Sequence, residues 1–152
     1  MRGFIMYHKL IDKPRHRFID ELYVKPEHRK SNVAKSLIYH ICFGPLHLVV
    51  STSNADALRL YTSLGFCIVD DCLYNGSRSE FCMKTTSYRR TKLKLCKNVR
   101  HTYEVQDFEW KEMSEKMRLD MIKCLARHLK VSERTAKVRL RTTDSNIRYA
   151  IV

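Results

Sequence analysis

Several features that would place the chain in a special class are missing from its 152 residues. It has no apolar run long enough to span a membrane, and the apolar stretch in MRGFIMYHKLIDK is too short for a signal peptide. The six cysteines include no CxxC pair and no histidines at a zinc-ligand spacing, so we expect reduced thiols, no metal site and no disulfide framework. Internal repeats are also absent. We therefore expect one soluble cytoplasmic domain that does not bind membranes.

The composition is that of a globular protein with an unusual charge. Hydrophobic residues make up 44% of the chain, too many for a disordered segment. Lys and Arg number 29 against 16 Asp and Glu, which gives a net charge of +13. Residues 87–152 hold 17 basic and 8 acidic side chains, whereas residues 1–86 hold 12 and 8. This charge favours a polyanionic partner, such as nucleic acid, an acidic protein or a phosphorylated cofactor.

Hydrophobic periodicity predicts alternating strands and helices in the first half of the chain. The expected elements are a strand over 3–10, a strand over 18–24, a helix over 32–43, a strand over 46–52, a helix over 54–64 and a hairpin over 67–85. Gly44-Pro45 ends the first helix, and Asn54 and Gly65 are the expected N-cap and stop of the second.

The second half begins differently. Residues 87–100 carry six basic side chains and no acidic one, and we interpret them as a basic connection. Beyond it the pattern predicts a strand over 102–108, helices over 110–129 and 132–141, and a strand over 147–152. The fold class is therefore α/β (α+β), a mixed β-sheet flanked by helices.

The start of the helix at 32 has the properties of a phosphate site. A helix N-terminus presents unpaired N–H groups and the positive end of its dipole, and here Arg29 and Lys30 add formal charge. A second strand–helix unit, 46–64, follows. The two units predict a pyrophosphate cradle at the point where two parallel strands separate.

Two short motifs in these units point to a family. RKSNVA, from Arg29, is similar to the signature Arg/Gln-x-x-Gly-x-Gly/Ala, with Asn32 in the place of the glycine and Ala34 matching. NADALRLYTSLGF meets the pattern Asn-x-x-Ala-x-x-x-Tyr-x-x-x-Gly-Phe in full. With these motifs the chain resembles the GNAT superfamily of N-acetyltransferases, which transfer acetyl from acetyl-CoA to an amine. Asn tolerates left-handed backbone geometry better than most residues, so we expect Asn32 to keep the loop's shape and acetyl-CoA binding to be retained.

The resemblance implies roles for individual residues. Tyr61 would lie near the sulfur of CoA and protonate the leaving thiolate as general acid, with an ordinary pKa of about 10. Asn54 would contact the pantetheine arm. The alternative is that Tyr61 is only a core aromatic at helical spacing. No metal is implied, and the residues expected to contact acetyl-CoA are Leu22, Tyr23, Val24, Arg29, Lys30, Ser31, Asn32, Val33, Ala34, Lys35, Asn54, Ala57 and Tyr61.

The amine must lose a proton before it attacks, so a base is also needed. Asp20 and Glu21 lie on the strand that would line the pantetheine. Because adjacent strand residues face opposite sides, at most one of them can point at the substrate, and we favour Glu21. Either carboxylate could instead be solvated or salt-bridged. A chain of waters could replace both, as could a histidine, for which the candidates are His8, His16, His28 and His40.

The order of the elements differs from the order that the family shows. The family fold begins with strand, helix, helix and strand, whereas here residues 101–152 have that order at the other end of the chain. We therefore expect a single, circularly permuted domain, with an acetyl-CoA half (1–86), a connection (87–100) and the permuted unit (101–152). Alternatively, the C-terminal half completes the sheet of a second copy in a swapped dimer.

One rival interpretation concerns residues 125–141. LARHLKVSERTAKVRLR resembles a helix-turn-helix, although Lys130 stands where a glycine is usual in the turn. In that case the chain would bind nucleic acid through Arg134, Lys137, Arg139 and Arg141. For the acetyltransferase, the positive charge favours an acceptor amine on a macromolecule with an acidic surface, protein or RNA.

Overall fold

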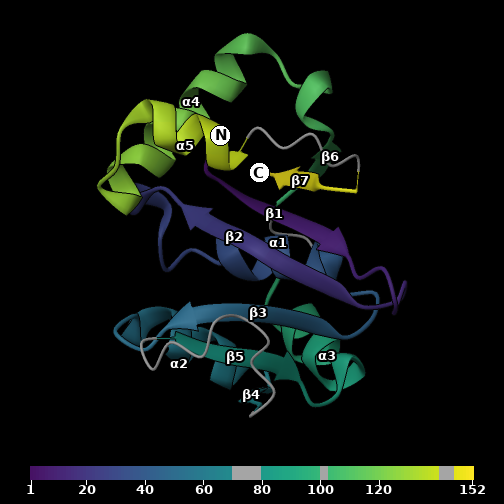
Figure 1. Ribbon diagram of the computed structural model, residues 1–152. Helices are drawn as coiled ribbons and strands as arrows, with labels where there is room; N and C mark the ends of the chain where they lie inside the picture. Colours follow the sequence, from purple (N-terminus) through teal and green to yellow (C-terminus); the bar gives the residue numbers. More distant parts are fainter. Residues whose placement is uncertain (70–79, 100–102, 141–145) are drawn as a thin grey trace.

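The computed structural model of the protein describes residues 1–69, 80–99, 103–140 and 146–152. Within them a seven-stranded mixed sheet runs through the molecule, with helices on both faces (Figure 1). In sheet order the strands are β4 (Phe66–Ile68), β5 (Glu80–Thr85), β3 (Leu46–Ser51), β2 (Arg17–Val24), β1 (Gly3–Lys9), β7 (Arg148–Ile151) and β6 (Gln106–Phe108). The predicted mixed sheet is thus confirmed.

Two groups of helices bury the two faces of the sheet. One face is covered by α1 (Val33–Ile41), α2 (Ala55–Ser63) and α3 (Tyr88–Val99), and the other by α4 (Glu115–Leu129) and α5 (Glu133–Leu140) (Figure 1). Short 3-10 turns, η1 (Pro26–His28) and η2 (Trp110–Glu112), precede α1 and α4. The strand β1 serves both cores because its side chains alternate: Ile5 packs on the first face and Phe4 on the second.

The two ends of the chain meet on neighbouring strands inside the sheet. Strand β1 pairs antiparallel with β7, so that Phe4 lies opposite Ile151. The Arg2 amide donates to the Val152 carbonyl at 2.6 Å, and the Val152 amide donates to Gly3 at 3.1 Å, which places the termini side by side (Figure 1). The strand–helix–helix–strand order predicted for the C-terminal part is present as β6, α4, α5 and β7, with shorter strands than expected.

Residues 87–100 differ from the prediction, because most of them form the helix α3 instead of an extended connection. The helix packs against α1 through Leu95, which is fully buried. Thr91 is buried as well, and its hydroxyl donates to the Leu64 carbonyl at 2.6 Å. After the helix, Tyr103 and Val105 pack on the core.

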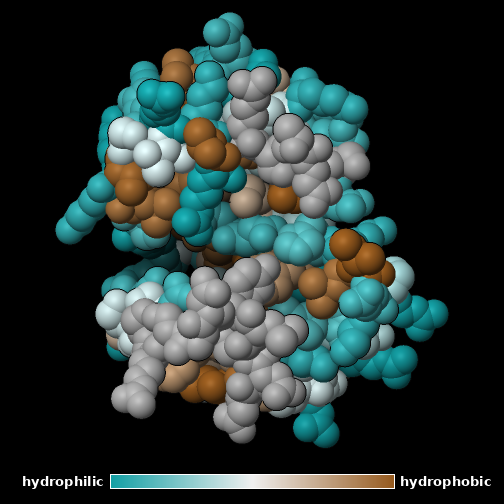
Figure 2. Space-filling model, in the orientation of Figure 1, coloured by the Kyte–Doolittle hydropathy of each residue, from teal (hydrophilic) through white to brown (hydrophobic). Residues whose placement is uncertain are grey.

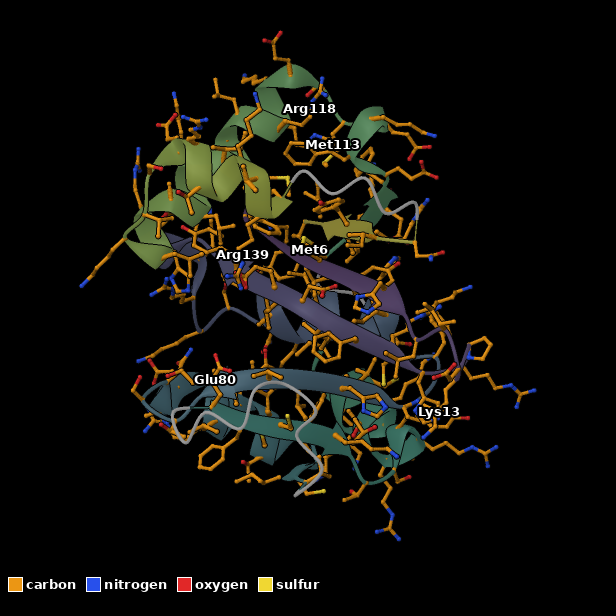
Figure 3. The ribbon with its side chains drawn as sticks, in the orientation of Figure 1. Met6, Lys13, Glu80, Met113, Arg118 and Arg139 are labelled. Carbon is orange, nitrogen blue, oxygen red and sulfur yellow. The ribbon has the colours of Figure 1, made fainter. Side chains whose placement is uncertain are left out.

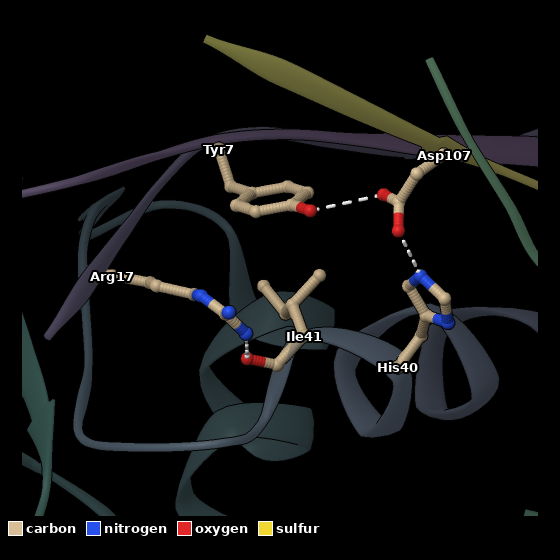
Figure 4. A network of polar contacts seen from close by, with 5 residues as sticks. All are labelled: Tyr7, Arg17, His40, Ile41 and Asp107. Carbon is tan, nitrogen blue, oxygen red and sulfur yellow. Dashed lines mark hydrogen bonds and ion pairs between the residues drawn. The ribbon is translucent and has the colours of Figure 1, made fainter. Parts of the chain in front are cut away.

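A polar network joins β6 to β1 and to α1 (Figure 4). Asp107, on β6, accepts a hydrogen bond from the Tyr7 hydroxyl at 2.9 Å and pairs with His40 of α1 at 2.5 Å. Burial, and then the charge of Asp107, raise the pKa of Tyr7 to about 12. Beside it the Arg17 guanidinium donates to the Ile41 carbonyl at 2.6 Å, at the end of α1. The network fixes α1 against β1 and β6.

The predicted hairpin over 67–85 is confirmed in its strands, because β4 and β5 pair antiparallel; its loop lies outside the described residues. The expectation of six reduced thiols was wrong. Cys82 is disulfide-bonded, while Cys42, Cys67, Cys96 and Cys124 are free. Among the helices in the described part of the chain, none combines the length and the apolar character that crossing a bilayer requires.

Candidate functional site

The parallel strands β2 and β3 separate within the sheet. They pair only from Arg17 opposite Leu46 to Ile19 opposite Leu48, although β2 continues to Val24 and β3 to Ser51. Figure 1 shows the two strands diverging toward their arrowheads, and the surface is hollowed between the same two parts at the left of Figure 2. The predicted separation of two parallel strands is therefore present. It leaves backbone groups on both strands facing a gap, which is where an extended ligand can form strand-like hydrogen bonds.

The helix α1 begins at the open end of this gap. Its N-cap, Asn32, has φ 66° and ψ 11°, so it takes the left-handed conformation that glycine adopts most readily. Lys30 is left-handed as well, with φ 59°. The amides of Val33, Ala34 and Lys35 belong to the first turn and have no acceptor within the helix. The loop therefore has the backbone shape and the free donors that a phosphate group requires.

Side chains in and around this loop mainly stabilise its backbone through hydrogen bonds to main-chain carbonyls. The Arg29 Nε donates to the Val24 carbonyl at 3.1 Å, which folds this predicted phosphate ligand back onto the end of β2. The Ser31 hydroxyl donates to the His28 carbonyl. On the outer side, the Tyr103 hydroxyl donates to the Ser31 carbonyl at 2.9 Å, a contact that sequence reasoning missed. Lys30 and Lys35 supply the remaining positive charge near the loop.

The left-handed conformation of Asn32 leads to a test by substitution. A β-branched residue is strained there by about 2 kcal/mol, whereas glycine is not. We expect Asn32→Val to weaken acetyl-CoA binding by about 30-fold, because α1 must shift to relieve the strain. Isothermal titration calorimetry with Asn32→Gly as the matched control checks this. Equal affinities of the two variants would show that the conformation at this position does not matter for binding.

The motif that ends in Gly-Phe places Tyr61 under the sheet. Tyr61 is buried, 6% exposed, and its ring packs on Phe66 with the centroids 5.3 Å apart. Gly65 makes this possible, because its φ of +90° turns the chain from α2 back into β4. Burial, and then the charge of Glu21, raise the pKa of Tyr61 well above its ordinary value. The expectation of an ordinary pKa was wrong, and the hydroxyl keeps its proton throughout the physiological range.

The other predicted contacts fall into two groups. Asn54 caps α2 as expected, with its Oδ1 accepting from the Ala57 amide at 3.2 Å. Leu22 and Val24 pack on the α1 face of β2, next to the gap. The Tyr23 side chain points to the opposite face, where its ring meets His128 with the centroids 5.4 Å apart. Tyr23 therefore offers only its backbone to a ligand in the gap.

A β-bulge changes the expected geometry of the two candidate bases. Met6 lies opposite Glu21, but Tyr7 lies opposite Ile19. In the pairing register no residue of β1 lies opposite Asp20, and the alternation of side chains is broken there. Asp20 and Glu21 both act on the α4–α5 face: the charge of Asp20 raises the pKa of Tyr149 there, and Glu21 pairs with Arg139. The bulge therefore removes the strict alternation on which the choice between Asp20 and Glu21 rested, and the identity of the base stays a prediction. Asp20 is engaged with His8 at 2.7 Å.

Glu21 is a buried carboxylate with an incomplete set of partners. Its side chain is 14% exposed, and burial raises its pKa, whereas the Arg139 guanidinium lowers it. The Arg139 Nε lies 3.0 Å from Oε1, but at an angle that makes no hydrogen bond, so Oε1 has no hydrogen-bond partner within the described residues. The charge of Glu21 also contributes to the raised pKa of Tyr61. The arrangement unites a carboxylate that can accept a proton and a hydroxyl that can donate one.

Other features of the described residues lie away from this site. A cleft of about 230 Å³ is found between α1 and α3, lined by residues such as Tyr39 and Lys92, on the outer side of α1. No group of three or more His, Cys, Asp or Glu side chains in the described ranges could hold a metal ion. The turn between α4 and α5 contains Lys130 in the left-handed conformation. Arg139, predicted to face DNA, is paired with Glu21 instead, and Arg141 lies outside the described residues.

Comparisons with known proteins agree with the motifs. Residues 1–66 match the model of the acetyltransferase (GNAT) family. Similar solved structures include a nourseothricin acetyltransferase, with 27% identity over 55% of this chain and 56% of that one and a TM-score of 0.46. The ribosomal-protein-S18-alanine N-acetyltransferase of Escherichia coli has 23% identity over 56% and 61%, with a TM-score of 0.45. Arabidopsis thaliana Naa50, bound to a bisubstrate analogue, has 23% identity over 55% and 64%, with a TM-score of 0.44.

These matches are partial. The chain covers between about half and two thirds of the length of the solved structures to which it is similar. Among curated proteins, none matches the sequence. The family match covers β1 to the start of β4, the part that contains the separated strands, the left-handed loop and the Tyr61 motif. The part of the chain that is similar to the acetyltransferase (GNAT) family is therefore residues 1–66.

Proposed function

We propose that the chain is an acetyl-CoA-dependent N-acetyltransferase that transfers acetyl to an amine on an acidic macromolecule. One observation carries the proposal: β2 and β3 separate beyond Ile19, and the left-handed start of α1 lies at the open end. Glu21 lies on β2 and Tyr61 on the helix after β3, and the charge of Glu21 contributes to the raised pKa of Tyr61. Asn32–Lys35 would hold the pyrophosphate through backbone amides, and the facing edges of β2 and β3 would hold the pantetheine.

Acetyl-CoA supplies an activated acetyl group as a thioester. Glu21 takes a proton from the acceptor's ammonium, which frees the nitrogen lone pair for attack on the acetyl carbon. Tyr61 donates its hydroxyl hydrogen toward the sulfur as the carbon–sulfur bond breaks. Its raised pKa makes Tyr61 a weak acid but a persistent donor, so its main role is to stabilise the charge that develops on sulfur. The charge of Asp20, which pairs with His8, raises the pKa of the Glu21 carboxyl.

A thermal melt tests the proposal. A ligand present at about 100 times its dissociation constant stabilises a protein by about 2.7 kcal/mol, which raises the melting temperature by several degrees. We expect this rise with acetyl-CoA and with desulfo-CoA, and none with duplex DNA. Release of CoA thiol in the presence of acceptor peptides then measures transfer. Absence of a rise with either CoA compound would contradict the proposed function.

We also propose that the domain is circularly permuted relative to its family. The adjacent termini and the unit β6–α4–α5–β7 beside β1 support this. A chain that begins at 103, continues through a short Gly linker from Val152 to Met1, and ends at 99 would have the family's order of elements. It should fold and bind acetyl-CoA as the natural chain does.

A further inference from the structure

An ion pair joins Glu21, the proposed base, to Arg139 in the C-terminal part of the chain. Glu21 lies on β2, and Arg139 reaches it from α5. Figure 3 labels Arg139 between α5 and the sheet. The Arg139 Nη2 donates to Oε2 at 3.4 Å and its Nε lies 3.0 Å from Oε1. A cation of the protein thus occupies the position that an acceptor's ammonium must take if Glu21 is to accept its proton.

The two partners differ in how firmly they are held. The Glu21 side chain is 14% exposed, whereas the Arg139 side chain is 52% exposed. Arg139 can therefore move into solvent while Glu21 stays in place. Glu21 without a cation would be a buried and unpaired charge, which is costly. The ammonium of the acceptor must therefore replace the Arg139 guanidinium beside Glu21.

The surface around this exchange is positive. Arg134 and Lys137 are exposed on α5, and within the described residues neither forms an ion pair. The exposed Lys130 lies at the turn before this helix. A purely cationic acceptor is repelled here, whereas an acceptor with carboxylates next to its amine is attracted. Its carboxylate can also take the place of Glu21 on the displaced Arg139.

We propose that Arg139 determines acceptor specificity by this exchange of ion pairs, so that the preferred acceptor is the amino terminus of an acidic peptide, with carboxylate side chains in the two residues that follow the first. The inference rests on the proposed function for the transfer step. In that step the peptide's ammonium pairs with Glu21 and its carboxylate with Arg139. Glu21 takes one proton from the ammonium and the nitrogen bonds to the acetyl carbon. The carbon–sulfur bond breaks, the thiolate takes a proton from Tyr61, and the second proton of the nitrogen returns to Tyr61.

Two synthetic peptides that differ only in residues two and three, Glu-Glu in one and Lys-Lys in the other, test the specificity. For the natural chain we expect kcat/KM for the Glu-Glu peptide to exceed that for the Lys-Lys peptide by about tenfold or more. Arg139→Gln should lose most of this ratio. Arg134→Gln is the matched control, because Arg134 is exposed on the same helix and does not contact Glu21, and it should keep most of the ratio.

The pH profile of kcat/KM distinguishes this role of Arg139 from a purely structural one, which would not shift the profile. The charged and titratable groups that affect Glu21 are Arg139 from α5, Asp20 from its own strand and Tyr61 from α2. Of these, only Arg139 lowers the pKa of Glu21. Arg139→Gln should therefore move the acidic limb of the profile to higher pH, while Arg134→Gln should leave it in place. An unmoved limb would overturn the proposal.

A measurement without catalysis separates this proposal from the proposed function. In protein labelled with carbon-13 at the glutamate carboxyls, the Glu21 resonance is assigned by its loss in Glu21→Gln. We expect the Glu-Glu peptide to shift this resonance saturably and the Lys-Lys peptide to leave it unchanged. A shift without any acetyl transfer would contradict the acetyltransferase but keep the exchange. Transfer that proceeds equally with both peptides, or no shift with either, would overturn the exchange.

Discussion

Replacing Glu21 by Gln should lower kcat for acetyl transfer by about 10²- to 10⁴-fold, the range expected for a general base, while acetyl-CoA affinity stays within about threefold. The amide keeps the size of the carboxylate and one acceptor oxygen but cannot accept a proton. Because Arg139 is half-exposed, it becomes solvated when Glu21 loses its charge, and the fold should be retained. Kinetics of CoA thiol release and calorimetry with acetyl-CoA measure the two quantities.

The pH dependence sharpens this prediction. Burial raises the pKa of Glu21, and only the carboxylate form can act as the base. The rate should therefore fall as the pH falls through that raised pKa, and this limb should be lost in Glu21→Gln. Glu27→Gln, an exposed glutamate in η1 that forms no ion pair within the described residues, is the matched control. If Glu21→Gln keeps both its rate and its acidic limb, the base lies elsewhere.

Tyr61→Phe should lower kcat by about 10²-fold, the cost of removing one donor to a developing charge. The ring remains, so its packing on Phe66 and the affinity for acetyl-CoA should be kept. The change should be seen in kcat and much less in the dissociation constant. Calorimetry and steady-state kinetics on the same preparation distinguish the two.

The control for this variant is Tyr39→Phe, at a half-buried tyrosine of α1 that lines the cleft on the outer side of the helix. It removes a hydroxyl from the same face of the molecule but away from the gap, and it should leave kcat unchanged. A large loss of acetyl-CoA affinity in Tyr61→Phe would mean that Tyr61 is only a packing residue. An unchanged kcat in Tyr61→Phe would mean that the thiolate leaves without a proton donor.

Much of the fold could be predicted because local patterns and tertiary structure agree over residues 1–66. The apolar positions Val33, Leu37, Ile38 and Ile41 are buried, as their helical spacing indicated. Asn32 takes the left-handed conformation because its short side chain tolerates it and the strand–helix connection requires it. The separation of β2 and β3 was also predictable, because each of the two parallel strands leads into its own helix.

The parts that were missed depend on contacts between distant residues. The helix α3 has so many basic residues that its buried positions, Thr91 and Leu95, gave too weak a periodic signal for a helix. The bulge at Asp20 arises from the register between β1 and β2, which no local motif marks. Glu21 and Arg139 are 118 positions apart, and the basic side chain fitted a DNA-binding face equally well. The disulfide at Cys82 likewise has no spacing signature in the sequence.

The pairing of the two chain ends on neighbouring strands also determines how the molecule responds to force. Strands β1 and β7 are antiparallel, and their ends at Phe4 and Ile151 are opposite each other. Traction applied to the two termini therefore pulls across the strands and loads their hydrogen bonds one after another, not all at once. The pair should unzip at low force, starting at Arg2 and Val152. Opening it detaches β6, α4, α5 and β7 as one unit, and with them Arg139 leaves Glu21.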